Sequence, residues 1–483
     1  MAFNLLAQVA FTAVLARSLQ PADFGAFAMA GLALRFVSVF AQLGTVQTLV
    51  QAPALGPGMV ATALALALTA SMVLYGLAVA LAPLAAMFFQ VDGLLPLIVA
   101  LGLSLPLSAL GAVPTALLTR AGLFRPLSAI EIVSYAFGFG AVAVSCALAG
   151  LGAWSLVWGS LAQQGLSVAL GYACLRPRPD LSWPRTRPDW GAILRPGSRY
   201  SAIGFLEFLW ASVETLAVGR WLGSGPLGVL NRAQMLASLP TELAVRSLTR
   251  VAFPALSAIQ ADRTRMADAF LVLLALNGGI SVVLSAGLLA AAPDVVMALL
   301  GPRWSEAAPV MAAVALGVPA LFLYHACGIT LDSLSRLDEK LRLQAGLLVL
   351  KVGTVAALLP AGLVAVAFGV AFIEYLRAAA GLVLICRVLP VHRRALFHAL
   401  AAVCLAGLVV AGAVVSAREL AHLAGAGLSA GLIAQGTALA LAGGLCAWAG
   451  LVASRSWPPL DSMETLRRWR DGLLSWRRKG YRA

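Results

Sequence analysis

Residues 14–25 read VLARSLQPADFG, and residues 217–228 read AVGRWLGSGPLG. At a constant offset, three pairs of residues coincide: Arg17 with Arg220, Leu19 with Leu222, and Gly25 with Gly228. The two stretches lie at the ends of the first and the seventh long apolar runs, where a duplication of six helices would place them. Because six is an even number, the repeat predicts two halves that cross a membrane in the same direction.

The composition excludes a water-soluble enzyme. The chain has 483 residues, of which 61% are hydrophobic and 11% are charged, and its mean hydropathy is +0.92. Soluble domains are about 45 to 50% apolar and about 25% charged. The chain is therefore expected to be an integral membrane protein, with most of its length in helices of about 20 apolar residues each.

Apolar stretches, split at polar or Pro/Gly-rich breaks, predict fourteen membrane-spanning helices. Their approximate bounds are 2–16, 26–50, 59–82, 94–118, 127–149, 154–175, 200–222, 227–248, 267–291, 307–331, 343–360, 363–386, 395–416 and 428–453. The predicted fold class is an all-α polytopic membrane protein with two parallel six-helix lobes around a central cavity, plus helices 13 and 14. No cleavable signal peptide is expected, because the short first apolar run lacks a basic region before it.

These spans divide the chain into five predicted parts. They are an N-terminal lobe of helices 1–6 (1–175), a cytoplasmic linker (176–199), a C-terminal lobe of helices 7–12 (200–394), helices 13 and 14 (395–453), and a basic cytoplasmic tail (454–483). In the tail, Leu466, Trp469, Leu473 and Trp476 share one helical stripe with arginines alongside. Such a pattern predicts an amphipathic helix on an anionic membrane surface, with a solvated tail as the alternative.

Basic residues fix the predicted orientation. Connections on one side of the membrane contain only Arg17, Arg303 and Arg418, whereas those on the other side hold most of the chain's 34 lysines and arginines, including six arginines in the linker. Because cytoplasmic loops are enriched in Lys and Arg, both termini are predicted to be cytoplasmic. The net charge of +14 therefore indicates topology and contact with membrane lipids, and no nucleic-acid partner is expected.

Two separated motifs resemble a known family. They are LARSLQPADFGAFAMA at 15–30, followed by Gln42-Leu43-Gly44 and Leu49-Val50-Gln51, and GRWLGSGPLGVLNRAQMLASLP at 219–240, followed by VAFPALSAIQAD at 251–262. Over residues 5–390 the chain resembles bacterial polysaccharide and O-antigen flippases of the multidrug/oligosaccharidyl-lipid/polysaccharide exporter superfamily. The resemblance implies a bacterial inner-membrane protein that moves an undecaprenyl-pyrophosphate-linked sugar repeat unit to the outer leaflet through a V-shaped cavity between two lobes.

Motifs for enzymatic chemistry are missing from the sequence. It has no GxxxxGK[ST] phosphate loop, and its six cysteines show neither CxxC nor His-Cys metal spacing. No catalytic residue, cofactor or metal is therefore expected. Energy for transport would come from an ion gradient or from the flux of the substrate.

Cationic residues within the spans are candidates for binding pyrophosphate. A charge at the centre of a membrane helix costs about 2.5 to 3.5 kcal/mol on insertion scales, so such residues face protein or water. Arg35, Lys351 and Arg377 lie deep in their predicted helices, and Arg220 lies near a helix end. Alternatives are structural pairing, for Arg377 with Glu374, and for Arg220 an extension of the side chain to the membrane surface.

Two acidic residues are candidates for proton coupling. Glu207 and Glu214 lie two turns apart, and so share one face of the seventh predicted helix. A carboxylate in such surroundings can exchange a proton during transport, and the alternative is an ion pair with a neighbouring cation. Glu242 and Arg246, four residues apart, are expected to form a structural pair.

The predicted function is therefore a flippase for lipid-linked oligosaccharides in lipopolysaccharide or exopolysaccharide biosynthesis, working by alternating access. Expected partners are the lipid-linked substrate, a polysaccharide polymerase and glycosyltransferases. Two alternatives from the same superfamily are an ion-coupled multidrug exporter and a lipid II flippase. An alternative of another class is a non-transporting scaffold of a polysaccharide synthesis complex.

Overall fold

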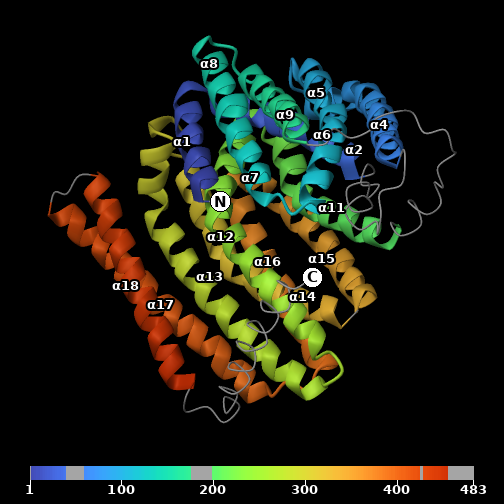
Figure 1. Ribbon diagram of the computed structural model, residues 1–483. Coiled ribbons are helices and arrows are strands. Elements are labelled where there is room, and N and C mark those ends of the chain that lie inside the picture. Colours follow the sequence, from blue (N-terminus) through green and yellow to red (C-terminus); the bar gives the residue numbers. More distant parts are fainter. Residues whose placement is uncertain (1, 40–58, 176–197, 335, 425–427, 455–483) are drawn as a thin grey trace. The chain divides into compact units, whose positions relative to one another are not determined.

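The structure is a computed structural model that describes residues 2–39, 59–175, 198–334, 336–424 and 428–454 (Figure 1). Over these residues the regular structure is entirely helical. Nearly all of the predicted linker and tail lies outside the described residues, as do the motif residues 42–44 and 49–51. The predicted amphipathic stripe at 466–476 therefore stays a prediction.

The described helices follow the predicted spans. In the first half they are α1 (Ala2–Ser18), α2 (Pro21–Val39), α4 (Met59–Phe89), α5 (Leu94–Gly102), α6 (Ser104–Arg120), α7 (Phe124–Val133), the π-helix η1 (Ser134–Ala141), α8 (Val142–Leu148) and α9 (Trp154–Cys174). In the second half they are α11 (Ser198–Trp221), α12 (Ser224–Ala258), α13 (Arg263–Leu299), α14 (Ala307–Ser333), α15 (Leu337–Leu358), α16 (Leu363–Val388), α17 (Arg393–Leu423) and α18 (Leu428–Ser454), with short 3₁₀ turns at Pro302–Trp304 and Leu359–Ala361. Joined across short breaks, the described residues form fourteen helical segments, so the prediction of an all-α, fourteen-helix protein is confirmed.

Several helices are longer than the spans predicted for them. α13 has 37 residues, which makes it about 55 Å long at 1.5 Å per residue, whereas the apolar core of a bilayer is about 30 Å thick. Charged residues at its start, such as Arg263 and Arg265, continue the helix without being apolar. A prediction from hydropathy therefore locates the apolar part of such a helix, which lies in the bilayer, and misses its polar ends.

Two predicted spans contain an interruption. Helix geometry breaks at Leu103 between α5 and α6, where Pro106 has no N–H to donate to the carbonyl of Gly102 four residues earlier. Between α7 and α8, the chain forms the π-helix η1. A Cβ on Gly138 or Gly140 would collide with α9 at Gln163 or with the ring of Phe11 on α1, so these glycines let η1 pack closely against both helices.

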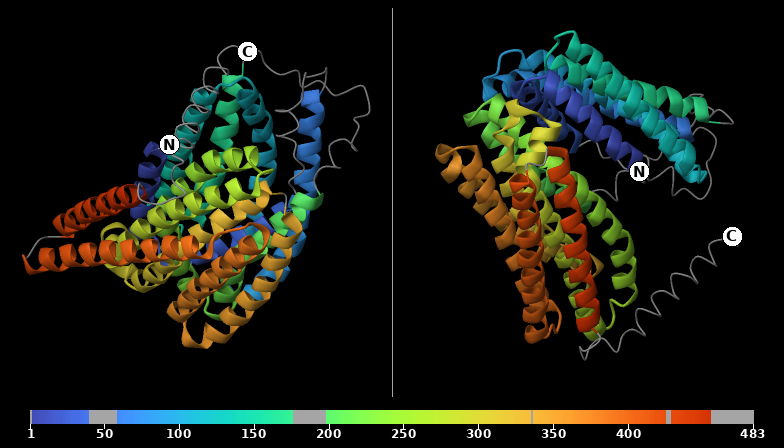
Figure 2. Two further views of the ribbon diagram at one scale, coloured as in Figure 1. Left: turned by 90° about the horizontal axis from the view of Figure 1, so that it is seen from below. Right: turned by 90° about the vertical axis from the view of Figure 1, so that its left-hand side faces the viewer.

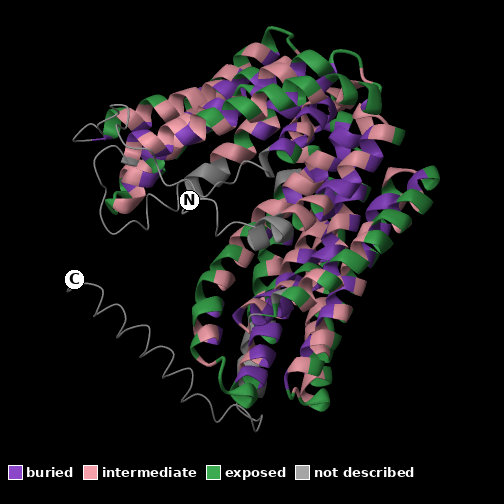
Figure 3. Cartoon of the chain, turned by 90° about the vertical axis from the view of Figure 1, so that its right-hand side faces the viewer, coloured by how far each residue is buried: buried purple, intermediate pink, exposed green. Residues whose placement is uncertain are grey.

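The surface of the helices is that of a multi-pass membrane protein. Eight described helices are long and apolar enough to cross a membrane. Figure 3 shows exposed residues along the helices. They include large apolar residues, among them Leu84 at 61%, Met87 at 74% and Val349 at 74%. Soluble monomers do not expose apolar surface on this scale, and lipid covers it at no cost.

By the density of their contacts, the described helices form two compact units. Unit 1 comprises residues 1–239, 292–314 and 338–374, and unit 2 comprises 240–291, 315–337 and 375–483. The division crosses α12 and α13 next to prolines inside these helices, Pro240 and Pro293, and it also crosses α14 and α16. A proline removes one backbone hydrogen bond from its helix, and a helix bends most easily at such a residue.

Unit 2 has its core where α12, α13, α14 and α16 meet. Phe270 on α13, Leu331 on α14 and Ile385 on α16 are fully buried in one cluster. Beyond it, α17 and α18 run side by side (Figure 2). A smaller apolar cluster around Ala286 and Val410 joins them to α13.

Unit 1 is organised around a close crossing of α2 and α12. A Cβ on Gly25 would overlap the carbonyl oxygen of Ser224, and a Cβ on Gly228 would overlap the carbonyl oxygen of Pro21. Gly25 and Gly228 are the residues that coincide in the internal repeat, and their two contacts are reciprocal. The crossing is therefore a backbone-to-backbone contact that only glycine permits at both positions.

Further contacts near this crossing also occur in reciprocal pairs. The Trp304 indole N–H donates a hydrogen bond to the Ala16 carbonyl at 2.8 Å, while Phe89 packs against Gly219, the repeat equivalent of Ala16. Arg17 donates to the Ala298 carbonyl at 2.8 Å, and the equivalent Arg220 donates to the Gln90 side chain at 2.9 Å. Each half thus contacts the other through equivalent positions, which supports an internal duplication.

Replacing Gly25 or Gly228 with alanine should destabilise the protein. Each added methyl group forces the two backbones apart, and overpacking of this kind costs about 1 to 3 kcal/mol. Because one displacement relieves both collisions, the double variant should lose less stability than the sum of the single variants. Thermal unfolding of the detergent-purified protein measures these losses.

Gly31 on α2 and Gly225 on α12 are matched controls. A Cβ at either position meets no atom within 4 Å, so alanine there should leave the melting temperature unchanged or raise it through its higher helix propensity. Equal melting temperatures for Gly25→Ala and Gly31→Ala would contradict the close crossing.

Candidate functional site

A buried ion pair joins two of the residues that the sequence singled out. Lys351 on α15 places its Nζ 2.6 Å from Oε1 of Glu214 on α11, with side-chain exposures of 2% and 9%. The same Nζ donates to the Trp210 carbonyl at 2.8 Å and lies 4.7 Å from the centre of the Trp210 ring. Lys351 and Glu214 therefore form an ion pair with each other. For Glu214, such a pair was the alternative that the sequence left open.

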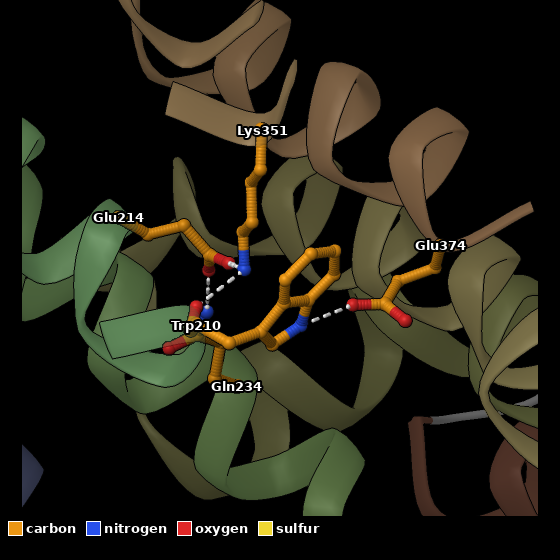
Figure 4. A network of polar contacts seen from close by, with 5 residues as sticks. All are labelled: Trp210, Glu214, Gln234, Lys351 and Glu374. Carbon is orange, nitrogen blue, oxygen red and sulfur yellow. Dashed lines mark hydrogen bonds and ion pairs between the residues drawn. The ribbon is translucent and has the colours of Figure 1, made fainter. Parts of the chain in front are cut away.

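Two more side chains complete this network (Figure 4). Gln234 on α12 donates to the second oxygen of Glu214 at 2.5 Å, and the Trp210 indole donates to Glu374 on α16 at 3.0 Å. All five residues belong to unit 1. Four helices are thus linked by hydrogen bonds at one buried place.

The network follows from helix geometry and from the burial of its charged groups. Trp210 and Glu214 are four residues apart, and so lie on one face of α11. A lone buried charge would cost several kcal/mol, whereas Lys351 and Glu214 each meet an opposite charge and further hydrogen-bonding groups. The pair is therefore a polar connection that the surrounding apolar helices can bury.

The other predicted residues lie in different surroundings. Arg35 on α2 and Glu207 on α11 are exposed. Arg377 on α16 is buried, and its guanidinium carbon lies 3.8 Å from the centre of the Tyr324 ring. Arg220 bonds to Gln90 at the end of α4, as described above. Lys351, Arg377 and Arg220 thus lie beside different residues, Glu214, Tyr324 and Gln90.

One predicted pair outside this site is confirmed. Arg246 donates to Glu242 at 3.1 Å, and the two side chains are 64% and 60% exposed. Exposed pairs of this kind contribute about 0 to 1 kcal/mol. The pair is structural and peripheral.

A cavity of about 380 Å³, lined by both polar and apolar surface, lies in unit 1. Helices α1, α9 and α12 and the π-helix η1 contribute its lining residues, which are Gln8, Thr12, Tyr135, Phe139, Gln163, Asn231, Arg232, Gln234, Met235 and Ser238. Gln234 belongs both to this cavity and to the ion-pair network. A molecule in the cavity would therefore lie one side chain away from Glu214.

Arg232 is the cation of this cavity. Its Nη2 donates to the Asn231 side chain at 2.6 Å, and its guanidinium carbon lies 4.5 Å from the centre of the Phe24 ring. Its buried Nε has no hydrogen-bond partner among the residues that the structure describes. Asn231 and Phe24 thus hold the guanidinium in position, and its Nε–H is not used by the described residues.

Aromatic side chains line the cavity where η1 borders it. The rings of Tyr135 and Phe139 stack with their centres 5.4 Å apart, and Phe11 meets Tyr135 edge to face at 6.1 Å. π-helical turns are frequent at functional sites in helical proteins. Here the π-helix presents a stacked aromatic pair to a polar cavity.

The sequence did not identify this cavity. Arg232, Trp210 and Gln234 were assigned no role from the sequence. A usable signal was present in two i, i+4 pairs of polar residues within apolar helices, Gln8 with Thr12 and Gln234 with Ser238. Among the described residues, no group of three or more His, Cys, Asp or Glu could hold a metal ion.

Residues 14–309 match the family described as polysaccharide biosynthesis protein. The chain belongs to this family. It is 27% identical to the succinoglycan biosynthesis transport protein of Rhizobium meliloti over 63% of this chain and 61% of that protein. It is 28% identical to a lipopolysaccharide biosynthesis protein of Escherichia coli, over 45% of this chain and 44% of that protein. A teichuronic acid biosynthesis protein of Bacillus subtilis is 23% identical over 66% of each chain, so each match spans less than two thirds of the relative.

Solved structures show the same fold. The lipid II flippase MurJ in an inward closed conformation aligns with a TM-score of 0.72, covering 92% of this chain and 96% of that one at 12% identity. An inward-facing multidrug resistance MATE transporter aligns with a TM-score of 0.59, covering 79% and 93% at 15% identity. The fold is therefore shared with these flippases and exporters.

Removing one partner of the buried pair should cost more than removing both. Lys351→Met or Glu214→Gln leaves an uncompensated group in the core, and such single changes cost about 3 to 5 kcal/mol. The double variant Glu214→Gln/Lys351→Met should recover much of that loss, because no buried charge remains at the pair. Thermal unfolding of the purified protein, together with its yield in membranes, measures the cycle.

The exposed pair Glu242–Arg246 supplies the control, since Glu242→Gln or Arg246→Gln should change stability by less than about 1 kcal/mol. Additive losses for the two changes at Glu214 and Lys351 would contradict the buried pair.

Proposed function

We propose that this chain is a flippase that moves undecaprenyl-pyrophosphate-linked oligosaccharide repeat units from the inner to the outer leaflet of the bacterial inner membrane, for lipopolysaccharide or exopolysaccharide biosynthesis. The observation that carries the proposal is the cavity with its many polar side chains and its half-buried arginine, within a membrane protein of the polysaccharide biosynthesis family. Apolar helices bury polar side chains only where these serve each other or a ligand. A glycan is a ligand rich in hydroxyl groups.

The proposed mechanism is alternating access between two lobes, residues 1–175 and 200–394, with helices 13 and 14 (395–453) appended. The reciprocal contacts around Gly25 and Gly228 support two related halves. Shared fold with a lipid II flippase and a MATE exporter supports the same architecture. Prolines within α12, α13 and α14 offer points at which helices can bend as a cavity opens.

The cationic residues Arg35, Lys351, Arg377 and Arg220 are proposed to bind the pyrophosphate at successive stages of transport. Arginine offers phosphate a fork of donors, and lysine offers a compact charge. In this structure Lys351 is neutralised by Glu214. Its release to a phosphate would require that Glu214 lose its charge or gain another partner.

Glu214 and Glu207 are proposed to couple transport to protons. Protonation of Glu214 would remove its attraction for Lys351 and free the ammonium group for the pyrophosphate. The exposed Glu207, two turns away on α11, is proposed to pass protons to and from this site. One side chain, Glu214, would thus connect the gradient to the binding of substrate.

The substrate distinguishes the proposed flippase from the alternative transporters of the same superfamily. A lipid II flippase or an ion-coupled multidrug exporter has the same fold, so the fold does not separate them. The polar, cationic cavity favours an anionic, hydroxyl-rich substrate over an apolar drug. The names of the relatives, which refer to succinoglycan, lipopolysaccharide and teichuronic acid, favour a polysaccharide precursor over lipid II.

A non-transporting scaffold is the rival of another class. Such a protein would bind a polysaccharide polymerase and glycosyltransferases, which we also propose as partners of the flippase, without moving substrate itself. Loss of flipping with retained assembly, after neutralisation of the central charges, separates the two roles.

Residues 176–199 and 454–483 are expected to be cytoplasmic, because they hold the largest concentrations of basic residues. A single cysteine at position 187, in a cysteine-free background, should resist a membrane-impermeant thiol reagent added to intact spheroplasts. It should react once the cells are permeabilised. Ready labelling in intact spheroplasts would overturn the orientation.

Reconstituted protein should flip a fluorescent lipid-linked oligosaccharide, and an imposed pH gradient should accelerate it. Glu214→Gln mimics the protonated form, so this variant should bind substrate but lose most of the response to the gradient. Lys351→Ala should abolish flipping, whereas Lys351→Arg should keep part of it because the charge remains. The accessibility of the label to an added quencher, measured over time, reports each rate.

Glu242→Gln on the exposed pair is the matched control and should behave as the wild type. An unchanged gradient response in Glu207→Gln/Glu214→Gln would remove both acids from coupling. A wild type that flips no lipid-linked oligosaccharide would refute the flippase and leave the scaffold.

A further inference from the structure

The cavity in unit 1 has the chemistry of a sugar-binding site. Amide side chains of Gln8, Gln163 and Gln234 line it, together with the hydroxyl groups of Thr12 and Tyr135. Each amide or hydroxyl group can both donate and accept hydrogen bonds. Sugar hydroxyl groups have the same double capacity, whereas the isoprenoid part of a lipid-linked substrate has none.

Its size and its aromatic side also match a sugar. Small-molecule sites occupy about 300 to 1,000 Å³, and this cavity measures about 380 Å³. The stacked rings of Tyr135 and Phe139 supply an apolar surface beside the polar groups. A pyranose presents C–H groups on its faces and hydroxyl groups at its edge, so it fits a cavity with both kinds of wall.

The charge of the lining residues indicates which class of sugar the cavity would bind. Among the described residues that line the cavity, Arg232 carries a positive charge and no side chain is acidic. Arg232 is held by Asn231 and by the Phe24 ring, and its Nε lacks a partner among the described residues. A guanidinium offers five N–H groups in a fixed plane, a geometry that matches a carboxylate.

We propose that this cavity binds one acidic sugar residue of the transported glycan, with its carboxylate on Arg232 and its hydroxyl groups on the surrounding amides. The inference rests on the proposed function, since it names the class of glycan that the flippase would accept. It concerns the sugar rather than the pyrophosphate, because one guanidinium balances one carboxylate and leaves the multiple charge of a pyrophosphate unmatched.

The position of Gln234 connects this recognition to the ion pair. Its amide nitrogen donates to Glu214, and the same side chain lines the cavity. A sugar hydroxyl group that hydrogen-bonds to Gln234 would weaken the hydrogen bond between Gln234 and Glu214. Occupation of the cavity would in this way be transmitted to Glu214 and Lys351.

Two matched probes test the site directly. Methyl β-glucuronide and methyl β-glucoside differ in one carboxylate, and their binding to the purified full-length protein is measured by the rise in melting temperature with ligand concentration. The wild type should bind the glucuronide about tenfold more tightly, the factor that corresponds to one charge-assisted hydrogen bond. Equal affinities for the two probes, or no binding of either, would overturn the proposal.

Three variants assign the preference to this cavity. Arg232→Gln should reduce the ratio of affinities to about one, while Arg232→Lys, which keeps the charge without the fork, should retain part of it. Arg246→Gln, on the exposed surface of the same helix, should keep the full preference. Retention of the preference in Arg232→Gln would place the carboxylate elsewhere and refute the site.

Reconstituted flipping separates this inference from the proposed function. Wild-type protein should flip an acidic lipid-linked oligosaccharide faster than a neutral one, and Arg232→Gln should flip both at the slower rate. Flipping of both substrates at one rate by the wild type would refute the inference and leave the flippase intact. Flipping of neither substrate, with the probe preference present, would refute the flippase while the sugar site stood.

Discussion

The approach of two backbones at Gly25 and Gly228 sets the geometry of unit 1. Because α2 and α12 touch there without side chains between them, residues one turn further along each helix fall at fixed distances. Arg232 follows Gly228 by four residues and Phe24 precedes Gly25, so the crossing brings the guanidinium over the Phe24 ring. Trp304 also meets Phe24 edge to face, with the ring centres 5.4 Å apart. The cationic wall of the cavity thus depends on two missing Cβ atoms.

The fold could be predicted from the sequence because lipid imposes one simple rule. Each segment must be apolar and helical over about 20 residues, and the fourteen predicted spans follow from that rule alone. The Glu242–Arg246 pair was predictable for a similar reason, since i, i+4 spacing on one helix fixes the distance between the side chains.

The site required information that local spacing does not contain. Lys351 and Glu214 lie on different helices, so their contact depends on how far each helix is rotated about its axis. Hydropathy leaves that rotation open, because α11 and α15 carry apolar residues on nearly every side. The π-helix could not be predicted either, because the composition of its sequence, SYAFGFGA, is also that of a membrane α-helix. Arg232 is recognisable in the sequence as a charge, but its place in the cavity depends on how α1, α9 and η1 pack around it.

The π-helix also determines how the fifth span could lose a residue. A π-helix closes each hydrogen bond one residue later than an α-helix, so a residue lost from Ser134–Ala141 would be absorbed as the segment returned to α geometry. The helix that follows, α8, would then nearly keep its rotation about the axis. Residues inside the segment would change the face that they present, and Gly138 or Gly140 would leave its close contact with α9 or α1. The extra residue therefore acts locally, by placing two glycines against neighbouring helices without redirecting the rest of the span.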